Sequence, residues 1–148
     1  MKTAGSAVLA MLILAGCAGQ KVVTPPTVTG INPAAVDWAS AQRIDMTLDE
    51  FHFTPSQVSM AQDKPYSLHL VNSGKSTHSF SSAPFFSAVI LRPNQAGDAG
   101  ARSTGTVYVK PGETAVIDLV PVRKGKFAFE CTQPLHALFG MTGEIDVN

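Results

Sequence analysis

The sequence predicts an all-β fold in which two sheets pack face to face. Apolar and polar residues alternate over short segments, and clusters of Pro, Gly and Asn separate these segments. A side-chain period of two belongs to a strand with one buried face, and turn residues between such strands are typical of a sandwich. The chain has 148 residues, which suffices for one domain with a hydrophobic core.

The alternating segments follow one another from about residue 43 to the C-terminus. Their apolar positions, in chain order, are Ile44, Met46 and Leu48; Tyr66, Leu68 and Leu70; Val107 and Val109; Ala115, Ile117 and Leu119; Phe127 and Phe129; and Met141, Gly143, Ile145 and Val147. Two stretches interrupt the pattern. Residues 84–91 are mostly apolar and predict a short helical turn, and residues 93–105, rich in Gly, Asn and Ala, predict a surface loop.

The first residues predict an export signal. Lys2 precedes an almost continuously apolar stretch that is too short to cross a membrane. The stretch ends in Leu14-Ala15-Gly16-Cys17, which resembles a bacterial lipobox, in which cleavage precedes the cysteine and the cysteine carries lipid. By the same resemblance, Ala18 in place of Asp implies sorting to the outer membrane. The alternative is an ordinary signal peptide that is cut nearby.

These features divide the chain into three parts. We expect residues 1–16 to be the lipoprotein signal peptide, residues 17–42 to be a lipidated N-terminus and flexible linker, and residues 43–148 to be the folded domain. The stretch from Asp37 to Gln42 is a candidate for docking onto the domain. The protein is then expected to be exported and anchored by lipid in the cell envelope, facing the periplasm.

Charge and cysteine content narrow the function. Eleven basic residues balance eleven acidic ones, and cleavage before Cys17 removes only Lys2, so the net charge of the mature chain is near −1. This balance argues against a nucleic-acid partner. If Cys17 carries lipid, Cys131 is the remaining thiol in a compartment that favours disulfides. Such a thiol is buried and inert, paired with another molecule, or held by a metal, and the neighbouring ligand types favour the metal.

Cys131, His136 and Met141 occur at the spacing C-x4-H-x4-M. Thiolate, imidazole and thioether are the ligand types of a trigonal copper site with a long axial methionine. His78, just after the alternating segment that ends at Asn72, is the candidate for the second imidazole. Taken singly, Met141 is more often a core side chain and His78 a turn residue, so only the complete set predicts copper.

The region from about residue 45 to residue 148 resembles the cupredoxins, the small blue-copper β-sandwich proteins. The stretches that resemble the first half of the family's domain are Phe53-Thr54-Pro55, Leu70-Val71-Asn72 and His78-Ser79-Phe80. The ligand loop is most similar to the rusticyanin and sulfocyanin type, and the matching residues are Pro134, His136-Ala137, Gly140-Met141 and Gly143. Two features depart from the family: the Asp63-Lys64-Pro65 turn replaces a glycine, and residues 85–104 have no counterpart that we can match.

The resemblance implies a Greek-key sandwich with one type 1 copper ion. The implied ligands are His78, Cys131, His136 and Met141. It further implies that Ser79 and Thr132 hydrogen-bond near the cysteine sulfur. Electrons are implied to leave through the loop histidine beneath an apolar docking patch, which comprises Ala137, Leu138 and Phe139. For Phe139 the alternative is inward packing against the linker or Phe85-Phe86.

The sequence therefore predicts a lipid-anchored carrier of single electrons that is not an enzyme. We expect a redox protein as its partner, the membrane as its support through the N-terminal lipid, and a monomeric state. His52 and His69 are predicted non-ligands, and neither belongs to a His-x-His pair of the kind that multicopper oxidases use. The alternatives are a copper-binding protein for tolerance or delivery, although no Met-rich or His-rich tract is present, and a metal-free interaction module.

Overall fold

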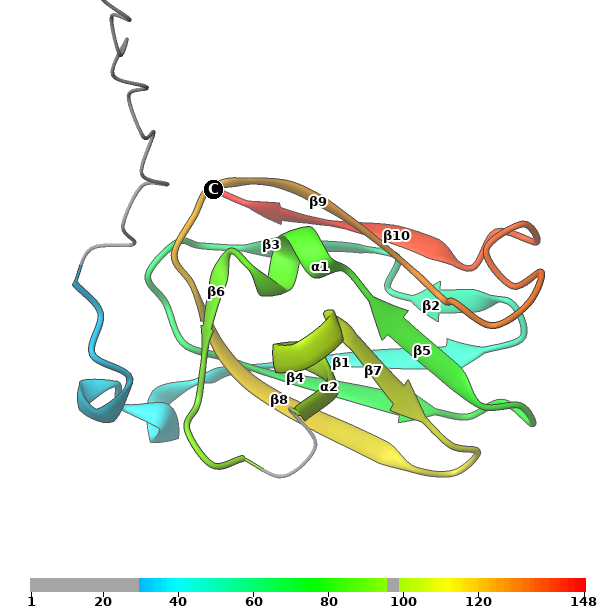
Figure 1. Ribbon diagram of the computed structural model, residues 1–148, viewed down its shortest axis with the longest axis horizontal. Coiled ribbons are helices and arrows are strands. Elements are labelled where there is room, and N and C mark those ends of the chain that lie inside the picture. The colour runs from blue at the N-terminus through cyan, green and yellow to red at the C-terminus, as the bar shows by residue number, and fades with distance from the viewer. Residues whose placement is uncertain (1–29, 96–98) are drawn as a thin grey trace, which may run out of the picture.

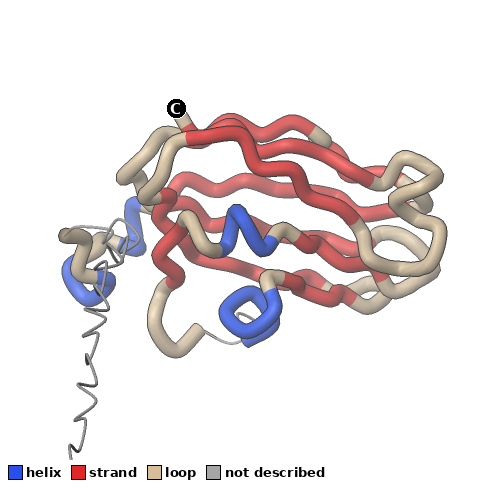
Figure 2. The backbone as a smooth tube through the Cα atoms, turned by 45° about the horizontal axis from the view of Figure 1, so that its top comes forward, coloured by secondary structure: helices blue, strands red, loops and turns tan. Residues whose placement is uncertain are grey.

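The computed structural model describes residues 30–95 and 99–148. Two five-stranded sheets face each other, as Figures 1 and 2 show, with strand orders β2-β1-β4-β8-β6 and β3-β10-β9-β5-β7. The strands are β1 (Gln42–Asp49), β2 (His52–Thr54), β3 (Gln57–Met60), β4 (Tyr66–Asn72), β5 (His78–Ser81), β6 (Val89–Leu91), β7 (Thr106–Val109), β8 (Thr114–Pro121), β9 (Gly125–Glu130) and β10 (Thr142–Val147). The predicted all-β sandwich is confirmed.

Strand pairing combines parallel and antiparallel neighbours. β1 runs parallel to β4, and β3 runs parallel to β10, whereas the other neighbours are antiparallel. The alternation seen in the sequence is the burial pattern: in β4 every second residue from Tyr66 to Asn72 is buried and the residues between them are half-buried. The two inner faces supply a single core.

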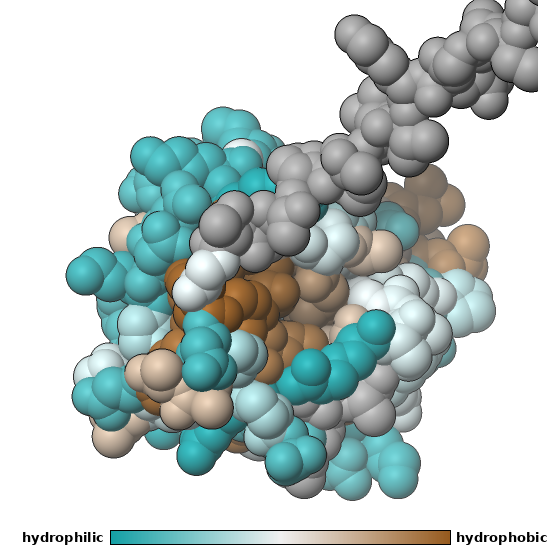
Figure 3. All heavy atoms as spheres, turned by 60° about the vertical axis from the view of Figure 1, so that its left-hand side comes forward, coloured by the Kyte–Doolittle hydropathy of each residue, from teal (hydrophilic) through white to brown (hydrophobic). Residues whose placement is uncertain are grey.

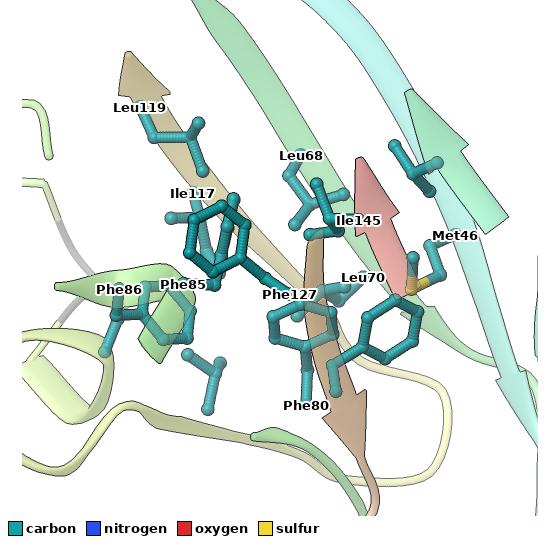
Figure 4. Packing of buried hydrophobic residues seen from close by; sticks show 14 of the residues in the cluster. Met46, Leu68, Leu70, Phe80, Phe85, Phe86, Ile117, Leu119, Phe127 and Ile145 are labelled. Carbon is teal, nitrogen blue, oxygen red and sulfur yellow. The ribbon is translucent and has the colours of Figure 1, made fainter. Parts of the chain in front are cut away.

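An aromatic cluster fills the centre of this core (Figure 4). The ring of Phe80 is fully buried and lies 4.8 Å from the ring of Phe129 and 5.8 Å from that of Phe86, measured between centroids. Ile117 and Leu119 from β8 pack into the same cluster. Because Phe80 lies two residues after His78 and Phe129 two residues before Cys131, the same packing fixes both strands that lead to the predicted copper ligands.

The segment that departs from the family pattern holds two helices and an edge strand. α1 covers Ala83–Phe86, with the Ser82 hydroxyl accepting from Phe85 N–H at 3.4 Å, and the helical turn expected over 84–91 stops there. Val89–Leu91 instead form β6, which pairs with β8, because an apolar run without periodicity does not distinguish strand from helix. The loop expected over 93–105 contains α2 (Ala99–Thr104), whose Ala101 is buried.

The N-terminal segment packs against the end of the sandwich. Residues 30–41 contain the short 3₁₀ helices η1 (Pro33–Ala35) and η2 (Trp38–Ser40), and the Arg92 guanidinium lies 6.0 Å from the centre of the Trp38 ring. The two short helices lie before residue 43, inside the stretch expected to be a flexible linker. Figure 3 turns the left-hand end of Figure 1 forward and shows apolar surface on that end of the molecule. The predicted signal peptide and Cys17 lie outside the described residues. Within the described ranges, no helix has the length and apolar character needed to cross a membrane.

Candidate metal centre

Strands of the second sheet bring the predicted ligands to one end of the sandwich. His78 is the first residue of β5, Cys131 directly follows β9, and Met141 directly precedes β10. His136 lies in the loop between Cys131 and Met141. Since β9 and β10 are antiparallel neighbours, this loop starts and ends at the same place, and Cys131 N–H donates to the Met141 carbonyl at 3.1 Å. We call residues 131–141 the ligand loop.

Backbone hydrogen bonds hold the ligand loop in one shape. Met141 N–H donates to the His136 carbonyl at 3.0 Å, and Phe139 N–H donates to the Leu135 carbonyl at 3.0 Å. Leu135 has φ of 69° and Gly140 has φ of 102°, which let the chain reverse within the loop. The backbone therefore ties Met141 to both Cys131 and His136 through direct hydrogen bonds.

The imidazoles of His78 and His136 and the thiol of Cys131 come together at the base of this loop. Nδ1 of His78 lies 3.2 Å from Nδ1 of His136, and the Cys131 sulfur lies 4.0 Å and 3.5 Å from these two nitrogens. Three donors around a metal at bond lengths of roughly 2.0–2.3 Å would be separated by roughly 3.5–4 Å. His78, Cys131 and Met141 are buried, so the protein shields the thiol and the first imidazole from bulk solvent. The donor set fits one type 1 copper ion.

Ser79 lies beside the cysteine sulfur, and Thr132 contacts Ser79. Ser79 N–H donates to the Cys131 sulfur at 3.4 Å, and the Ser79 hydroxyl lies 3.8 Å from it. The same hydroxyl accepts from Thr132 N–H at 2.8 Å and lies 2.9 Å from the Thr132 hydroxyl. The contact follows from strand register: Ser81 pairs with Glu130, so Ser79 comes opposite Thr132.

The electrostatic surroundings disfavour the protonated form of His78. Burial lowers the pKa of His78, and the nearby Glu50 carboxylate opposes this effect without cancelling it. Backbone N–H groups of Ser76 and Lys75 hold the pKa of Glu50 below its ordinary value, against the effect of desolvation. A neutral imidazole is the form that binds a metal, so the environment favours a ligand role for His78.

Three residues to which the sequence analysis gave no role in the site help to organise it. Asn72 is buried and donates to the carbonyls of Ser76 and Val109, both at 2.8 Å, which shapes the turn before His78. Phe51 places its ring edge-on to His136 with 4.9 Å between centroids. Glu50 precedes Phe51 in the turn between β1 and β2. No local pattern marks these residues, because their partners are distant in sequence.

The outer surface of the ligand loop is apolar. Leu138 is 78 % exposed and Phe139 is 58 % exposed, while Ala137 is half-buried and Leu135 adds further exposed apolar surface. The ring of Phe139 lies 5.1 Å from that of Phe51. Phe139 therefore does not pack inward against Phe85-Phe86, which was the alternative.

The two histidines predicted as non-ligands are placed outside the donor cluster. His52 is exposed and its Nδ1 lies 3.5 Å from an Asp49 carboxylate oxygen, while His69 contacts the Ser67 hydroxyl at 3.1 Å. Within the described ranges, the metal-capable cluster of His, Cys, Asp and Glu side chains comprises His78, Cys131 and His136.

Comparisons with known proteins agree with the fold and the site. A family model described as a cupredoxin-like domain matches residues 7–145. Auracyanin B is similar in structure, with a TM-score of 0.52 and 18 % identity over 74 % of this chain and 90 % of that chain. A dithionite-reduced auracyanin from the photosynthetic bacterium Roseiflexus castenholzii gives a TM-score of 0.52 and 16 % identity over 74 % and 98 %.

Domains of larger copper proteins are similar as well. A multicopper oxidase gives a TM-score of 0.54 and 16 % identity over 74 % of this chain and 45 % of that chain. Identities this low show a shared fold. Among curated proteins, no match was found. The family model spans most of the residues, and the sandwich and the His-Cys-His-Met set agree with it, so the chain belongs to the cupredoxin-like domain family.

Proposed function

We propose that this protein carries single electrons through one type 1 copper ion and is held by an N-terminal lipid at the periplasmic face of the cell envelope. One observation carries the proposal. Two imidazoles and a thiol converge under a loop whose outer surface is apolar and whose histidine, His136, is partly exposed. A buried donor set with one ligand near the surface suits electron exchange without binding of a substrate.

The protein residues limit rearrangement at the site. A bound copper ion supplies the exchange of one electron between Cu(II) and Cu(I). Cys131 and His136 lie in a loop closed by the hydrogen bond from Cys131 N–H to Met141, and His78 lies in a strand paired with β7. Since these backbone contacts hold the donors whichever oxidation state is present, little reorganisation is needed when the electron moves. Burial of Cys131 also protects the thiol from oxidants and from a second thiol.

The apolar surface of the ligand loop suits brief contact with a redox partner. Leu138 and Phe139 project beside His136, the ligand nearest the surface. Docking through these side chains brings a partner's redox centre close to the imidazole, and a small apolar contact separates quickly. We therefore assign His136 as the exit route for the electron and the two apolar residues as part of the docking patch.

The position of the N-terminal segment supports the anchored arrangement. Residues 30–41 join the sandwich at the end opposite the ligand loop (Figure 1). β1 leads from that end toward Glu50, and its eight residues span roughly 25 Å. An anchor attached at residue 17 would thus join the domain at the end away from the copper ligands and leave the ligand loop accessible to a partner in the periplasm.

The structural neighbours support a carrier role in different degrees. The auracyanin from Roseiflexus castenholzii was crystallised in a dithionite-reduced form, which indicates a centre that accepts electrons, and this chain covers 98 % of it. The multicopper oxidases are matched over 45 % and 26 % of their chains. The match extends over 90 % and 98 % of the two auracyanin chains, so we favour a carrier over an enzyme.

An absorption spectrum of the copper-loaded protein tests the proposal. We expect an intense thiolate-to-copper band near about 600 nm that disappears in Cys131→Ser. Met141→Leu should retain the band and shift the reduction potential, because the axial bond is weak. A colourless copper-loaded protein would refute the site.

Electron exchange then separates the two functions that the site permits. A carrier should show fast electron self-exchange, and a strain lacking the protein should lose electron flow without becoming sensitive to copper. Slow self-exchange together with copper sensitivity of that strain would favour copper tolerance or delivery.

A further inference from the structure

The two nitrogens of the His78 ring have different surroundings. The ring is fully buried, and Nδ1 faces the other donors, 3.2 Å from Nδ1 of His136. Nε2 is also buried and has no hydrogen-bond partner within reach among the described residues. The carboxylate oxygen Oε1 of Glu50 lies 3.6 Å from it. Because buried polar atoms are normally paired, this carboxylate is the candidate acceptor for Nε2–H, one short side-chain movement beyond hydrogen-bond distance.

The same carboxylate oxygen of Glu50 is held in place by two backbone hydrogen bonds. This Oε1 accepts from Lys75 N–H at 2.7 Å and from Ser76 N–H at 2.8 Å. These two donors belong to the turn that leads into His78. Glu50 therefore connects the turn between β1 and β2 to the residues just before this ligand. A side chain fixed by two backbone bonds keeps its charge at one position, unlike an ordinary surface glutamate.

Gly74 covers the contact between the acid and the imidazole. A Cβ atom at this position would lie 2.7 Å from Nε2 of His78 and 2.8 Å and 2.9 Å from the two carboxylate oxygens of Glu50. Real side chains do not approach so closely, so the backbone at Gly74 lies directly on the pair. The Gly74 backbone therefore restricts the access of water to the space between Nε2 and the carboxylate. An interaction between a charge and a dipole is stronger where water is excluded.

We propose that Glu50 is a positioning residue of the copper site, an anion that holds the Nε2–H tautomer of His78 and leaves Nδ1 free to bind the metal. The inference rests on the copper site of the proposed function and adds a residue to it. A histidine ligand commonly donates its second ring N–H to an outer acceptor, and a carboxylate in that role makes the ligand more basic. A fixed negative charge favours Cu(II) over Cu(I), so Glu50 lowers the reduction potential.

The first test does not depend on copper. In the metal-free protein, nitrogen-15 NMR of the neutral His78 ring reports which nitrogen carries the proton. We expect the proton on Nε2, exchanging slowly with solvent, in the wild type. Glu50→Gln keeps an oxygen for Lys75 and Ser76 but removes the charge, and we expect faster exchange and a mixed tautomer population. Proton occupancy of Nδ1 in the wild type would overturn the proposal.

The second test measures the reduction potential of the copper-loaded protein. We expect Glu50→Gln to shift the equilibrium between Cu(II) and Cu(I) about tenfold toward Cu(I), which is a rise of ~59 mV for one electron. Glu144→Gln is the matched control, because it makes the same substitution at a carboxylate of equal side-chain exposure, 32 %, that pairs with Lys126 instead of His78. We expect the control to shift the equilibrium less than about threefold.

The outcomes separate this inference from the proposed function. Equal shifts in the two variants, or none in Glu50→Gln, would show that the glutamate acts only as general surface charge and would overturn the proposal. A wild-type protein without the blue band would refute the copper carrier, while the NMR result on the metal-free protein would still decide whether Glu50 sets the tautomer.

Discussion

Replacing Ser79 with alanine tests how the cysteine sulfur is supported. The Ser79 hydroxyl accepts from Thr132 N–H at 2.8 Å but lies 3.8 Å from the Cys131 sulfur. The backbone N–H of residue 79, at 3.4 Å from the sulfur, remains in the variant. The distances therefore assign the hydroxyl mainly to the loop backbone and only weakly to the sulfur.

The expected magnitudes follow from these contacts. Loss of the hydroxyl leaves a partly buried Thr132 N–H without its acceptor, which should lower the free energy of unfolding by about 1–2 kcal/mol. The lost contact with the sulfur is long, so the potential should change by less than the ~59 mV that corresponds to a tenfold change for one electron. The change should be downward, because a donor stabilises the thiolate more when copper is reduced and the sulfur is more negative.

Three measurements on the same samples test this reasoning. Urea unfolding gives the free energy of unfolding, voltammetry gives the potential, and the absorption spectrum shows whether copper remains bound to the thiolate. Thr132→Val is the matched control, since it keeps the Thr132 N–H bond and removes only the 2.9 Å contact between hydroxyls. We expect the control to cost less than about 0.5 kcal/mol.

Two results would refute the assignment of the Ser79 hydroxyl. One is loss of the blue band in Ser79→Ala. The other is a change in reduction potential larger than ~59 mV with an unchanged free energy of unfolding. Either would show that the hydroxyl acts chiefly on the sulfur.

Three further predictions address the frame, the acid stability and the docking patch. Gly143→Ala should cost about 2–3 kcal/mol in urea unfolding, because the new Cβ would overlap the Ser56 carbonyl oxygen; full stability would contradict this packing. Burial works to raise the pKa of Asp118, but its hydrogen bonds and the charge of Arg92 hold it below the ordinary value. Asp118→Asn should therefore cost about 1–2 kcal/mol near pH 7, and this difference should shrink as the pH falls below about 4 through the lowered native pKa; a difference constant with pH would contradict the ion pair. Leu138→Ser should slow electron transfer to the redox partner several-fold with an unchanged spectrum and potential, and an unchanged rate would place the docking surface elsewhere.

Local patterns in the sequence are enough for the sandwich and for the ligand types. The alternation at Tyr66, Leu68 and Leu70 is the burial pattern of β4, because a strand with one buried face needs apolar side chains at every second position. The ligand loop is likewise local: eleven residues hold the thiol, the imidazole and the thioether, so their spacing alone indicates soft-metal chemistry.

The sequence did not predict β6 or α2, because the composition of these two segments is ambiguous. Residues 84–91 have no clear periodicity, and whether Val89–Leu91 form a strand depends on pairing with β8, which lies nearly thirty residues away. α2 likewise depends on the burial of Ala101 more than on helix propensity, since the segment contains glycine, serine and threonine.

The sequence by itself determined the sandwich, the chemistry of the copper donors and the choice of His78 as the second imidazole ligand. Only the tertiary structure decided what surrounds those donors. Strand register brings Ser79 opposite Thr132, and the turn between β1 and β2 brings Glu50 to His78, twenty-eight positions later in the chain. Ligand identity is written in short segments, whereas the charge and hydrogen bonds that tune a ligand come from chain segments that meet only when the sheets assemble.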